Sequence, residues 1–261
     1  MEVKGRLKKN LEMQKSYKDV FEPITGETLF RLASRKKFIK LESPLKIGKE
    51  SNIFSAIAKV DNKTERVAIK IYRILECNFK RMGHYLEMDD RFRTMKSRRA
   101  IIMTWAKREY KNLLKAHKAG ISVPKPIAQF NNVLIMEFIG EKNPEKQPIV
   151  APLLKDKCDN PEEMFKKVVL NMKLLYQKAR LVHGDLSEFN ILNLNNEPII
   201  IDLSHGTPID QARELFDRDI KNICIFFNKL GINIKEQDLI NKIVEKDKNE
   251  CIKKNISKNE H

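Results

Sequence analysis

Four polar residues in the second half of the sequence have the types and spacing of a phosphoryl-transfer site. His183, Asp185 and Asn190 form the pattern His-x-Asp with Asn five residues after the Asp, and Asp202 follows an apolar run. Phosphoryl transfer needs a carboxylate that accepts the proton of the attacking hydroxyl. It also needs an amide oxygen and a second carboxylate that hold a metal on the nucleotide phosphates. The spacing is that of a kinase catalytic loop followed by its metal-binding aspartate.

A lysine and a glutamate upstream could complete such a site. Lys70 lies in 67–72, whose sequence Val-Ala-Ile-Lys-Ile-Tyr matches the strand that presents a phosphate-binding lysine. An exposed strand lysine is the alternative for this segment taken alone, and the catalytic loop makes that alternative weak. Glu109 lies on the apolar face of a helix predicted over 100–119, where an unpaired carboxylate would be costly. We therefore expect Glu109 to pair with Lys70.

A turn of small and polar residues could also contact the phosphates. Gly48-Lys49-Glu50-Ser51-Asn52 separates two apolar stretches of the segment 41–60. Backbone N–H groups of such a turn can bind phosphate oxygens. Because it has one glycine where the usual kinase loop has three, a plain hairpin turn is the alternative interpretation.

The elements that must position these residues follow from hydrophobic periodicity. We expect strand pairs within 41–60 and 127–139, a strand at 67–72, and helices that begin at residue 28 and that span 100–119, 161–178 and 211–230. A turn is predicted at 23–26 and an extended, charged excursion at about 75–99.

Composition and charge narrow the class of protein. The chain has 261 residues, 41% hydrophobic and 33% charged, and a net charge of +16. This charge is either a lysine-rich solvated surface or an electrostatic footprint for nucleic acid. The four cysteines are far apart and form no zinc or disulfide pattern. No signal peptide or long apolar stretch is present, so we expect a cytoplasmic protein with no membrane partner.

Taken together, the motifs resemble one kinase family. The segments that carry the resemblance are 48–52, 68–72, 104–106, 119–126, 136–140, 151–154, 181–190 and 201–204. In this combination and order the chain resembles the RIO family of atypical protein kinases over about residues 20–230, and within it the Rio1 type. The Rio2 type has a winged-helix domain before the kinase, for which residues 1–39 are too few.

The resemblance implies an α+β, bilobal protein-kinase-like fold. Its N-lobe would be rich in β-strands, and its reduced helical C-lobe would lack the subdomains that bind peptide substrates. We expect an N-terminal helical extension over 1–39, an N-lobe over 40–139 with a mobile insertion at about 75–99, a C-lobe over 140–240 with the catalytic loop, and a basic tail over 241–261.

The resemblance also implies roles for matched residues. These are Asp185 as catalytic base, Asn190 and Asp202 as ligands of Mg²⁺ or Mn²⁺, Lys70 on the ATP phosphates with Glu109 as its partner, Lys49 and Ser51 beside the triphosphate, and Met136, Glu137 and Ile139 around the adenine. Asp202 matches the family's phosphoryl acceptor, so an aspartyl phosphate is expected. From its position in the loop we expect His183 to be structural and His205 to be an incidental loop residue.

One departure from the family pattern leaves alternatives open. Gly184 stands where the family often has Ala, and His-Gly-Asp is also the loop of aminoglycoside phosphotransferases. Leu203-Ser204 replaces the Phe-Gly of ordinary kinases, which favours the RIO family. The alternatives are a small-molecule kinase, a kinase of a tRNA-modification complex, and a nucleotide-binding scaffold with little turnover.

The segment after Asp202 bears on the substrate. The 59 residues from there to residue 261 contain no Ala-Pro-Glu motif, which ordinary kinases have after the activation segment. We expect weak activity on generic peptides, with ATP hydrolysis to ADP or autophosphorylation as the readout. The family's role in maturation of the small ribosomal subunit implies a pre-ribosomal particle, with its rRNA and ribosomal proteins, as partner.

Overall fold

A computed structural model describes residues 21–75, 77–87, 89–92 and 97–245. Its helices and strands, in chain order, are α2 Pro23–Ser34, β1 Lys40–Ile47, β2 Ser51–Val60, β3 Lys63–Tyr72, α3 Phe79–Glu87, α4 Arg98–Lys118, β4 Pro126–Phe130, β5 Val133–Glu137, α5 Pro161–Gln177, β6 Leu181–Val182, β7 Ile191–Leu194, β8 Glu197–Ile200, η1 Leu203–His205, β9 Thr207–Pro208, η2 Ile209–Gln211, α6 Arg213–Lys229 and α7 Glu236–Val244. Much of the expected N-terminal extension and of the basic tail lies outside the described residues.

The N-lobe is an antiparallel five-stranded sheet in the order β1-β2-β3-β5-β4. Its central strand β3 is buried on both faces from Arg66 onward. Side chains alternate across a strand. Val67, Ile69 and Ile71 therefore pack into one hydrophobic core, while Lys70 and its alternating neighbours point to the opposite face, where the cleft lies. The strands expected from the sequence are confirmed.

Helix α2 packs on the sheet and corrects one prediction. Residues 23–26, expected to form a loop turn, are instead the first helical turn of α2, and Pro23 is its first residue. Proline is favoured there because its missing N–H would have no partner within the helix. Leu29 and Leu32 of α2 are buried in the same core as Ile69. Tertiary packing thus extends the helix through residues that would otherwise favour a turn.

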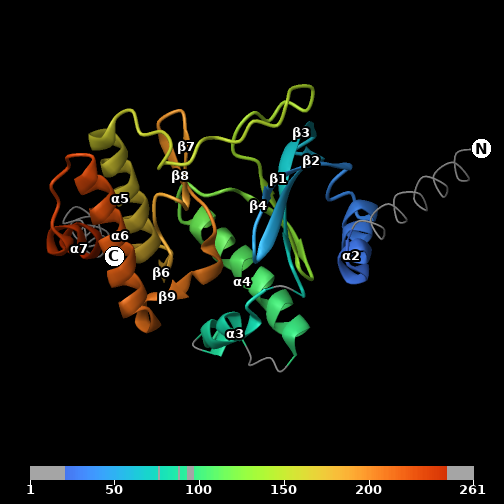
Figure 1. Cartoon of the computed structure of the whole chain (residues 1–261), viewed down its shortest axis with the longest axis horizontal. Coiled ribbons are helices and arrows are strands. Elements are labelled where there is room, and N and C mark those ends of the chain that lie inside the picture. Colours follow the sequence, from blue (N-terminus) through green and yellow to red (C-terminus); the bar gives the residue numbers. More distant parts are fainter. Residues whose placement is uncertain (1–20, 76, 88, 93–96, 246–261) are drawn as a thin grey trace, which may run out of the picture.

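Helix α4 lies between the two lobes, in the middle of Figure 1. It begins after Ser97, whose hydroxyl caps the Ala100 amide at 3.2 Å. The fully buried Trp105 of α4 packs with α3, and Leu113 of α4 belongs to the core of the C-lobe. Because both lobes pack against it, α4 is the element through which they share a fixed geometry.

The charged segment before α4 is not simply extended. It contains the helix α3, whose Met82 and Leu86 are buried against Trp105. The apolar residues are spaced at one helical turn, but the surrounding charge obscures this pattern in the sequence. Residues 76, 88 and 93–96 of the segment lie outside the described part, and its predicted mobility stays a prediction.

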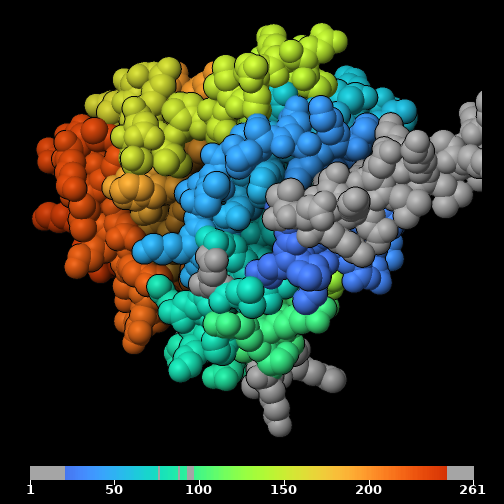
Figure 2. Space-filling model, turned by 45° about the vertical axis from the view of Figure 1, so that its right-hand side comes forward, coloured from blue at the N-terminus to red at the C-terminus, as the bar shows by residue number. Residues whose placement is uncertain are grey.

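The C-lobe consists of α5, α6 and α7 with the hairpin β7–β8 and the strand pair β6–β9. In Figure 1 the three helices form one side of the molecule and the sheet the other. Figure 2 shows the blue surface of β1 and β2 meeting the yellow-green and orange surface of the later chain. The predicted α+β bilobal fold is confirmed. Within the described residues, no helix is long and apolar enough to span a bilayer.

A buried arginine fixes the connection between the lobes. Arg66 of β3 is 1% exposed, and its guanidinium pairs with Glu42 at 2.8 Å. The same group donates to the carbonyls of Glu141 and Asn143 at 2.9 and 2.8 Å, and to that of Lys146 at 2.8 Å. Arg66 therefore satisfies several backbone acceptors of the loop that follows β5.

Replacement of this arginine tests that anchor. Arg66→Met should lower the free energy of unfolding by about 3 kcal/mol, because it leaves several buried acceptors unpaired. Chemical denaturation measures the change. Glu42→Gln, which keeps an acceptor oxygen beside Arg66, should cost less than about 1 kcal/mol. A loss below about 1 kcal/mol in Arg66→Met would contradict the anchor.

Candidate active site

A cleft of about 530 Å³ opens between the lobes. Cavities of this size hold drug-sized ligands. One part of the wall is apolar, with Ile53, Ala68 and Met136 of the N-lobe facing Leu192 of the C-lobe. The polar side chains of the lining include Ser51, Lys70, Asn190 and Asp202. The cleft thus offers one end for a flat apolar group and the other for charged groups.

A buried lysine joins the two sides of the cleft. The ammonium of Lys70, which is 3% exposed, donates to Glu109 Oε1 and to Asp202 Oδ1, both at 2.9 Å. The predicted pair between Lys70 and Glu109 is confirmed. Tyr72, two residues along β3, donates its hydroxyl to the other oxygen of Glu109. Sequence reasoning missed this role of Tyr72, because in the sequence it looks like an ordinary strand residue.

The charge of Lys70 follows from this arrangement. Burial alone would lower the pKa of Lys70, but the carboxylates of Asp202 and Glu109 outweigh it and raise the pKa above its usual range. Burial would likewise raise the pKa of Asp202, and the Lys70 ammonium holds it well below its usual range instead. The Asp202 side chain is 41% exposed because one side of it faces the open cleft. Protein atoms surround its carboxylate on the other sides. The pair is therefore ionised at neutral pH.

The two oxygens of Asp202 have different surroundings. Oδ1 accepts from Lys70 and also from Ser204 Oγ at 2.7 Å. Within the described residues, no hydrogen bond is found for Oδ2. The backbone of Asp202 is left-handed, with φ of 61°, a conformation that aspartate tolerates better than most residues. Asp202 is thus held by one oxygen while the other is available to a ligand in the cleft.

The catalytic loop presents Asp185 and Asn190 together. Asn190 Nδ2 donates to the Asp185 carbonyl at 2.8 Å and to its carboxylate at 3.4 Å. Among the described residues the amide oxygen of Asn190 has no hydrogen-bond donor, so it is available to a ligand in the cleft. His183 is 1% exposed, and its Nε2 contacts the Ile201 carbonyl at 2.9 Å. His183 therefore links the loop to the strand before Asp202, which agrees with the structural role expected for it.

Helix α6 holds the catalytic loop from below. Asp219, 2% exposed, accepts from the Gly184 amide at 2.8 Å and from the Leu186 amide at 2.7 Å. Arg218 donates to the Gly184 carbonyl. Burial raises the pKa of Asp219 to about 6. Sequence reasoning missed Asp219. Its only sign was its place directly before the apolar Ile220, a signal that the neighbouring acids Glu214 and Asp217 of the expected helix obscure.

The turn between β1 and β2 contains Lys49 and Ser51, which the resemblance places beside the triphosphate, and Glu50 between them. Ser51 lines the cleft, whereas Lys49 is exposed and does not. Glu50 lines the cleft instead, and burial together with the Asp202 carboxylate raises its pKa. From behind, Arg73 donates to the Gly48 carbonyl at 3.2 Å. The turn is thus held in place, with Ser51 and Glu50 facing the polar end.

The strand β5 and the residues after it form the other wall. Met136, Glu137 and Ile139 all line the cleft, as the predicted contacts with adenine require. The Glu137 amide already donates to the Lys125 carbonyl at 2.8 Å. The Ile139 carbonyl accepts from Ala151 at 2.9 Å, and its amide donates to no backbone group in the described part of the chain. The Ile139 amide is therefore a donor available to a ligand in the cleft.

His205 is not an incidental loop residue, and that interpretation is wrong. Its ring packs edge-on against Trp105 at 5.2 Å and against Tyr85 at 5.0 Å between centroids. Burial lowers the pKa of His205 to about 4, so the ring is neutral at physiological pH. It ties the turn after Asp202 to α3 and α4. Only the tertiary contacts distinguish it from a loop residue.

The polar end can hold a divalent cation only with help from a ligand. Among the described residues, no group of three or more His, Cys, Asp or Glu side chains could bind a metal by itself. Asp202 Oδ2 and the Asn190 amide oxygen are hard oxygen donors of the kind that Mg²⁺ prefers, and Mg²⁺ commonly completes its shell with phosphate oxygens and water. The donor set therefore fits a nucleotide-bound Mg²⁺.

Comparison with known proteins agrees with this geometry. The RIO domain family matches residues 52–240. The RIO-type serine/threonine-protein kinase Rio1 of Methanocaldococcus jannaschii is 38% identical over 250 residues, which cover 94% of this chain and 83% of that protein. The serine/threonine-protein kinase RIO1 of Saccharomyces cerevisiae is 32% identical over 88% of this chain and 53% of its own length.

Solved structures agree on the fold. The Rio2 kinase from Chaetomium thermophilum, in a complex with ADP, Mg²⁺ and phosphoaspartate, superposes with a TM-score of 0.62. It is 21% identical, over 85% of this chain and 66% of that one. A second structure of the same kinase gives a TM-score of 0.62 at 22% identity.

The raised pKa of Asp219 predicts an acid limb in nucleotide turnover. Below a pH of about 6, protonation turns one carboxylate oxygen of Asp219 into a hydroxyl. The Gly184 or Leu186 amide then loses its acceptor, and the backbone around Asp185 is held less firmly. Because the native pKa exceeds the ordinary value of 3.8, protonation of Asp219 in this window stabilises the fold. The activity should therefore fall there without unfolding, which rate–pH profiles and thermal melts would show together.

Asp219→Asn gives the matching variant. It should lower turnover at pH 7.5 by about tenfold, because one N–H then faces an amide NH₂, and it should lack the limb near pH 6. Asp217→Asn, on the exposed side of the same helix, should retain the wild-type profile. An unchanged limb in Asp219→Asn would show that another group causes it.

Proposed function

Because the chain belongs to the RIO family, as a member of the Rio1 type, we propose that it is an ATP-dependent serine/threonine kinase that also hydrolyses ATP. The observation that carries this proposal is the Lys70 ammonium, 2.9 Å from both Glu109 and Asp202 in a cleft that also contains Asn190. Kinases bring together a lysine, a glutamate, a metal-binding aspartate and an asparagine in this way, which supports the proposal. Family membership favours this over the small-molecule kinase alternatives.

The nucleotide would lie along the cleft with its base at the apolar end. Met136 and Ala68 would contact the ring, and the free amide of Ile139 would donate to its edge. The triphosphate would extend toward Ser51 and Lys70. Lys70 would keep Glu109 and exchange its bond with Asp202 for one with a phosphate oxygen. Lys49 is too peripheral in this geometry to be more than a solvent-side contact.

Asp202, through the oxygen that Lys70 releases, and Asn190, through its amide oxygen, would hold Mg²⁺ or Mn²⁺. When bound, the cation neutralises the charge that develops on the phosphates. Asp185 is 51% exposed on its side chain and lies where a hydroxyl group could approach the cleft. We assign it to orient that hydroxyl and accept its proton. Asp219 and Arg218 keep Asp185 in place through the backbone of Gly184.

Asp202 would have a second role as phosphoryl acceptor. Its Oδ2 would attack the γ-phosphorus, form an acyl phosphate and break the bond to the β,γ-bridging oxygen, so that ADP leaves. Water would then cleave the acyl phosphate and return the carboxylate and inorganic phosphate. Two observations support this: the missing partner of Oδ2 among described residues, and the phosphoaspartate complex of the Rio2 kinase relative. Carboxylates act as such nucleophiles in aspartyl-phosphate ATPases.

The cellular partner would be the maturing small ribosomal subunit. The net charge of +16 supports a ribonucleoprotein partner, since cations neutralise RNA phosphates without reading sequence. ATP turnover would then act as a slow switch on the particle rather than as a means of modifying many peptides.

We also propose that the boundary between the two lobes lies near residue 140. There Gly140 forms a β-bridge with Val150, just after the residues of β5 that line the cleft.

The acyl phosphate can be detected chemically. After incubation with γ-labelled ATP and Mg²⁺, we expect protein-bound label that hydroxylamine removes, because hydroxylamine cleaves acyl phosphates and leaves phosphoserine intact. Asp202→Asn should lose that label. Asp210→Asn, an exposed carboxylate beyond the same turn, should retain it. Hydroxylamine-resistant label that persists in Asp202→Asn would refute the acyl intermediate.

The partner can be tested by affinity capture. Asp185→Ala should slow release and enrich small-subunit rRNA and proteins relative to wild type, with large-subunit rRNA as the internal control for charge-driven binding. Washing at raised salt removes contacts that depend only on phosphate neutralisation. Equal recovery of both rRNAs, or of neither, would count against a role in small-subunit maturation.

A further inference from the structure

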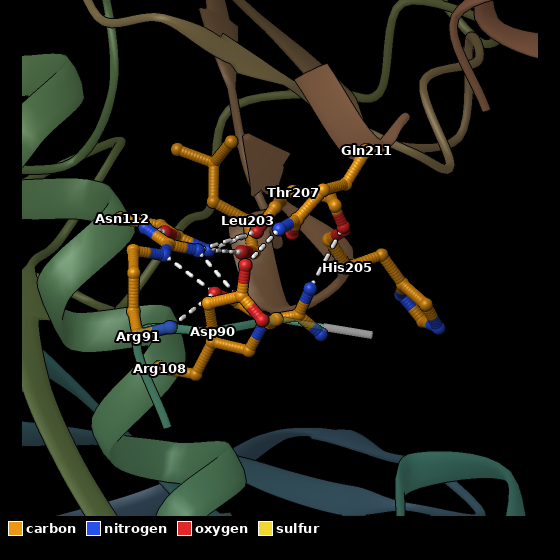
Figure 3. A network of polar contacts seen from close by, with 10 residues as sticks. Asp90, Arg91, Arg108, Asn112, Leu203, His205, Thr207 and Gln211 are labelled. Carbon is orange, nitrogen blue, oxygen red and sulfur yellow. Dashed lines mark hydrogen bonds and ion pairs between the residues drawn. The ribbon is translucent and has the colours of Figure 1, made fainter. Parts of the chain in front are cut away.

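A buried polar network connects α4 to the turn that follows Asp202. Figure 3 shows it: side chains of α4 and of the segment before α4 converge on the backbone of 203–207. None of these side chains takes part in the chemistry proposed above. Asp89, Arg91, Arg108 and Asn112 do not line the cleft, so the network could fix the turn without touching the nucleotide.

Asn112 is at the centre of the network. It is fully buried, and its Nδ2 donates to the carbonyls of Leu203 and Gly206 at 2.9 and 2.8 Å. These are the first carbonyl of η1 and that of the glycine that ends it. One side-chain amide therefore clamps both ends of the turn that begins directly after Asp202.

A charged cluster orients that amide. Arg91 donates to Asn112 Oδ1 at 2.9 Å and to the Gly206 carbonyl at 3.2 Å. Arg91 and Arg108 both bind the buried carboxylate of Asp89, at 2.6 and 3.0 Å. Because Arg91 can only donate, Asn112 must present its oxygen to Arg91 and its NH₂ to the turn.

The turn is shaped to accept this amide. A Cβ atom on Gly206 would lie 2.7 Å from Asn112 Nδ2 and 3.0 Å from the Leu203 carbonyl oxygen. Gly206 has an ordinary negative φ of −55°, so backbone conformation does not require glycine here. Close approach of the Asn112 amide does.

From these contacts we propose that Asn112 is a positioning residue for Asp202. It lies one helical turn after Glu109. Helix α4 therefore contacts Lys70 through Glu109 and the turn beyond Asp202 through Asn112. Arg91 and Asp89 extend this control to the segment before α4. The inference rests on the proposed function only in that Asp202 is taken as the metal ligand; the clamp itself is independent of it.

Amide hydrogen exchange tests the clamp in the full chain without nucleotide. The Gly206 amide, which donates to the Leu203 carbonyl at 3.1 Å, should exchange at least about tenfold faster in Asn112→Ala, because two buried hydrogen bonds are lost. Asn112→Asp should be at least as affected, since a carboxylate oxygen then faces two carbonyl oxygens. A role in packing alone would leave the near-isosteric Asn112→Asp unchanged.

Asn171→Ala is the matched control. Asn171 is another buried amide, which accepts from the Ser122 amide at 2.9 Å and lies away from the turn. It should lose stability without faster exchange at Gly206. Equal exchange in wild type, Asn112→Asp and Asn171→Ala would overturn the proposal.

Metal binding supplies the second readout. In the presence of ADP, calorimetry should show about 10–100-fold weaker Mg²⁺ binding in Asn112→Asp, as for residues that orient metal ligands, while ADP affinity without metal changes little. Faster exchange with unchanged Mg²⁺ binding would overturn the link to Asp202. If the wild type binds neither ADP nor Mg²⁺, the proposed function fails, and the exchange comparison still decides the clamp.

Two further variants guard against loss of folding in Asn112→Ala. Gly206→Ala should displace the Asn112 amide by its added Cβ. Arg91→Met should remove the donor to Asn112 Oδ1, and the buried Asp89 would keep Arg108 as its partner. Both should accelerate exchange of the amide of residue 206, relative to the intrinsic rate of the residue present there. Wild-type exchange in both variants would refute the network as a positioning device.

Discussion

The Lys70 ammonium is the interaction on which the rest of the structure depends. A buried cation is costly unless it is paired, and Lys70 is 3% exposed. It meets this requirement with one carboxylate from α4 and one from the turn after β8, on the far side of the cleft. The pairing therefore brings both lobes to a single atom. The cleft, its polar end and the free oxygen of Asp202 all follow from that convergence.

The groups proposed to do chemistry lie on loops, and buried side chains of two helices hold those loops. Helix α4 supplies Glu109 to Lys70 and Asn112 to the turn after Asp202. Helix α6 supplies Asp219 to the backbone on both sides of Asp185. The contacts of Asn112 and Asp219 end on backbone carbonyls and amides, so they fix geometry without competing for a ligand. Loops held in this way keep their free oxygens pointed into the cleft.

Residues proposed to bind the nucleotide and the metal can be predicted from the sequence better than residues that hold them in position. The strand with Lys70, the helix with Glu109 and their ion pair could be predicted, because each depends on local periodicity and on the cost of an unpaired buried charge. Asp219 and His205 could not, since their partners are remote in sequence. The start of α2 and the helix α3 were also mispredicted, because packing against the sheet and Trp105 outweighs local turn and charge signals.

The most direct measurement is a crystal structure with a non-hydrolysable ATP analogue and Mg²⁺. We expect Lys70 to keep its bond to Glu109 and to leave Asp202 for a phosphate oxygen. The released carboxylate of Asp202 and the amide oxygen of Asn190 should then both lie on the cation. A structure in which the pair between Lys70 and Asp202 stays at 2.9 Å, with the nucleotide bound elsewhere, would contradict the role given to this cleft.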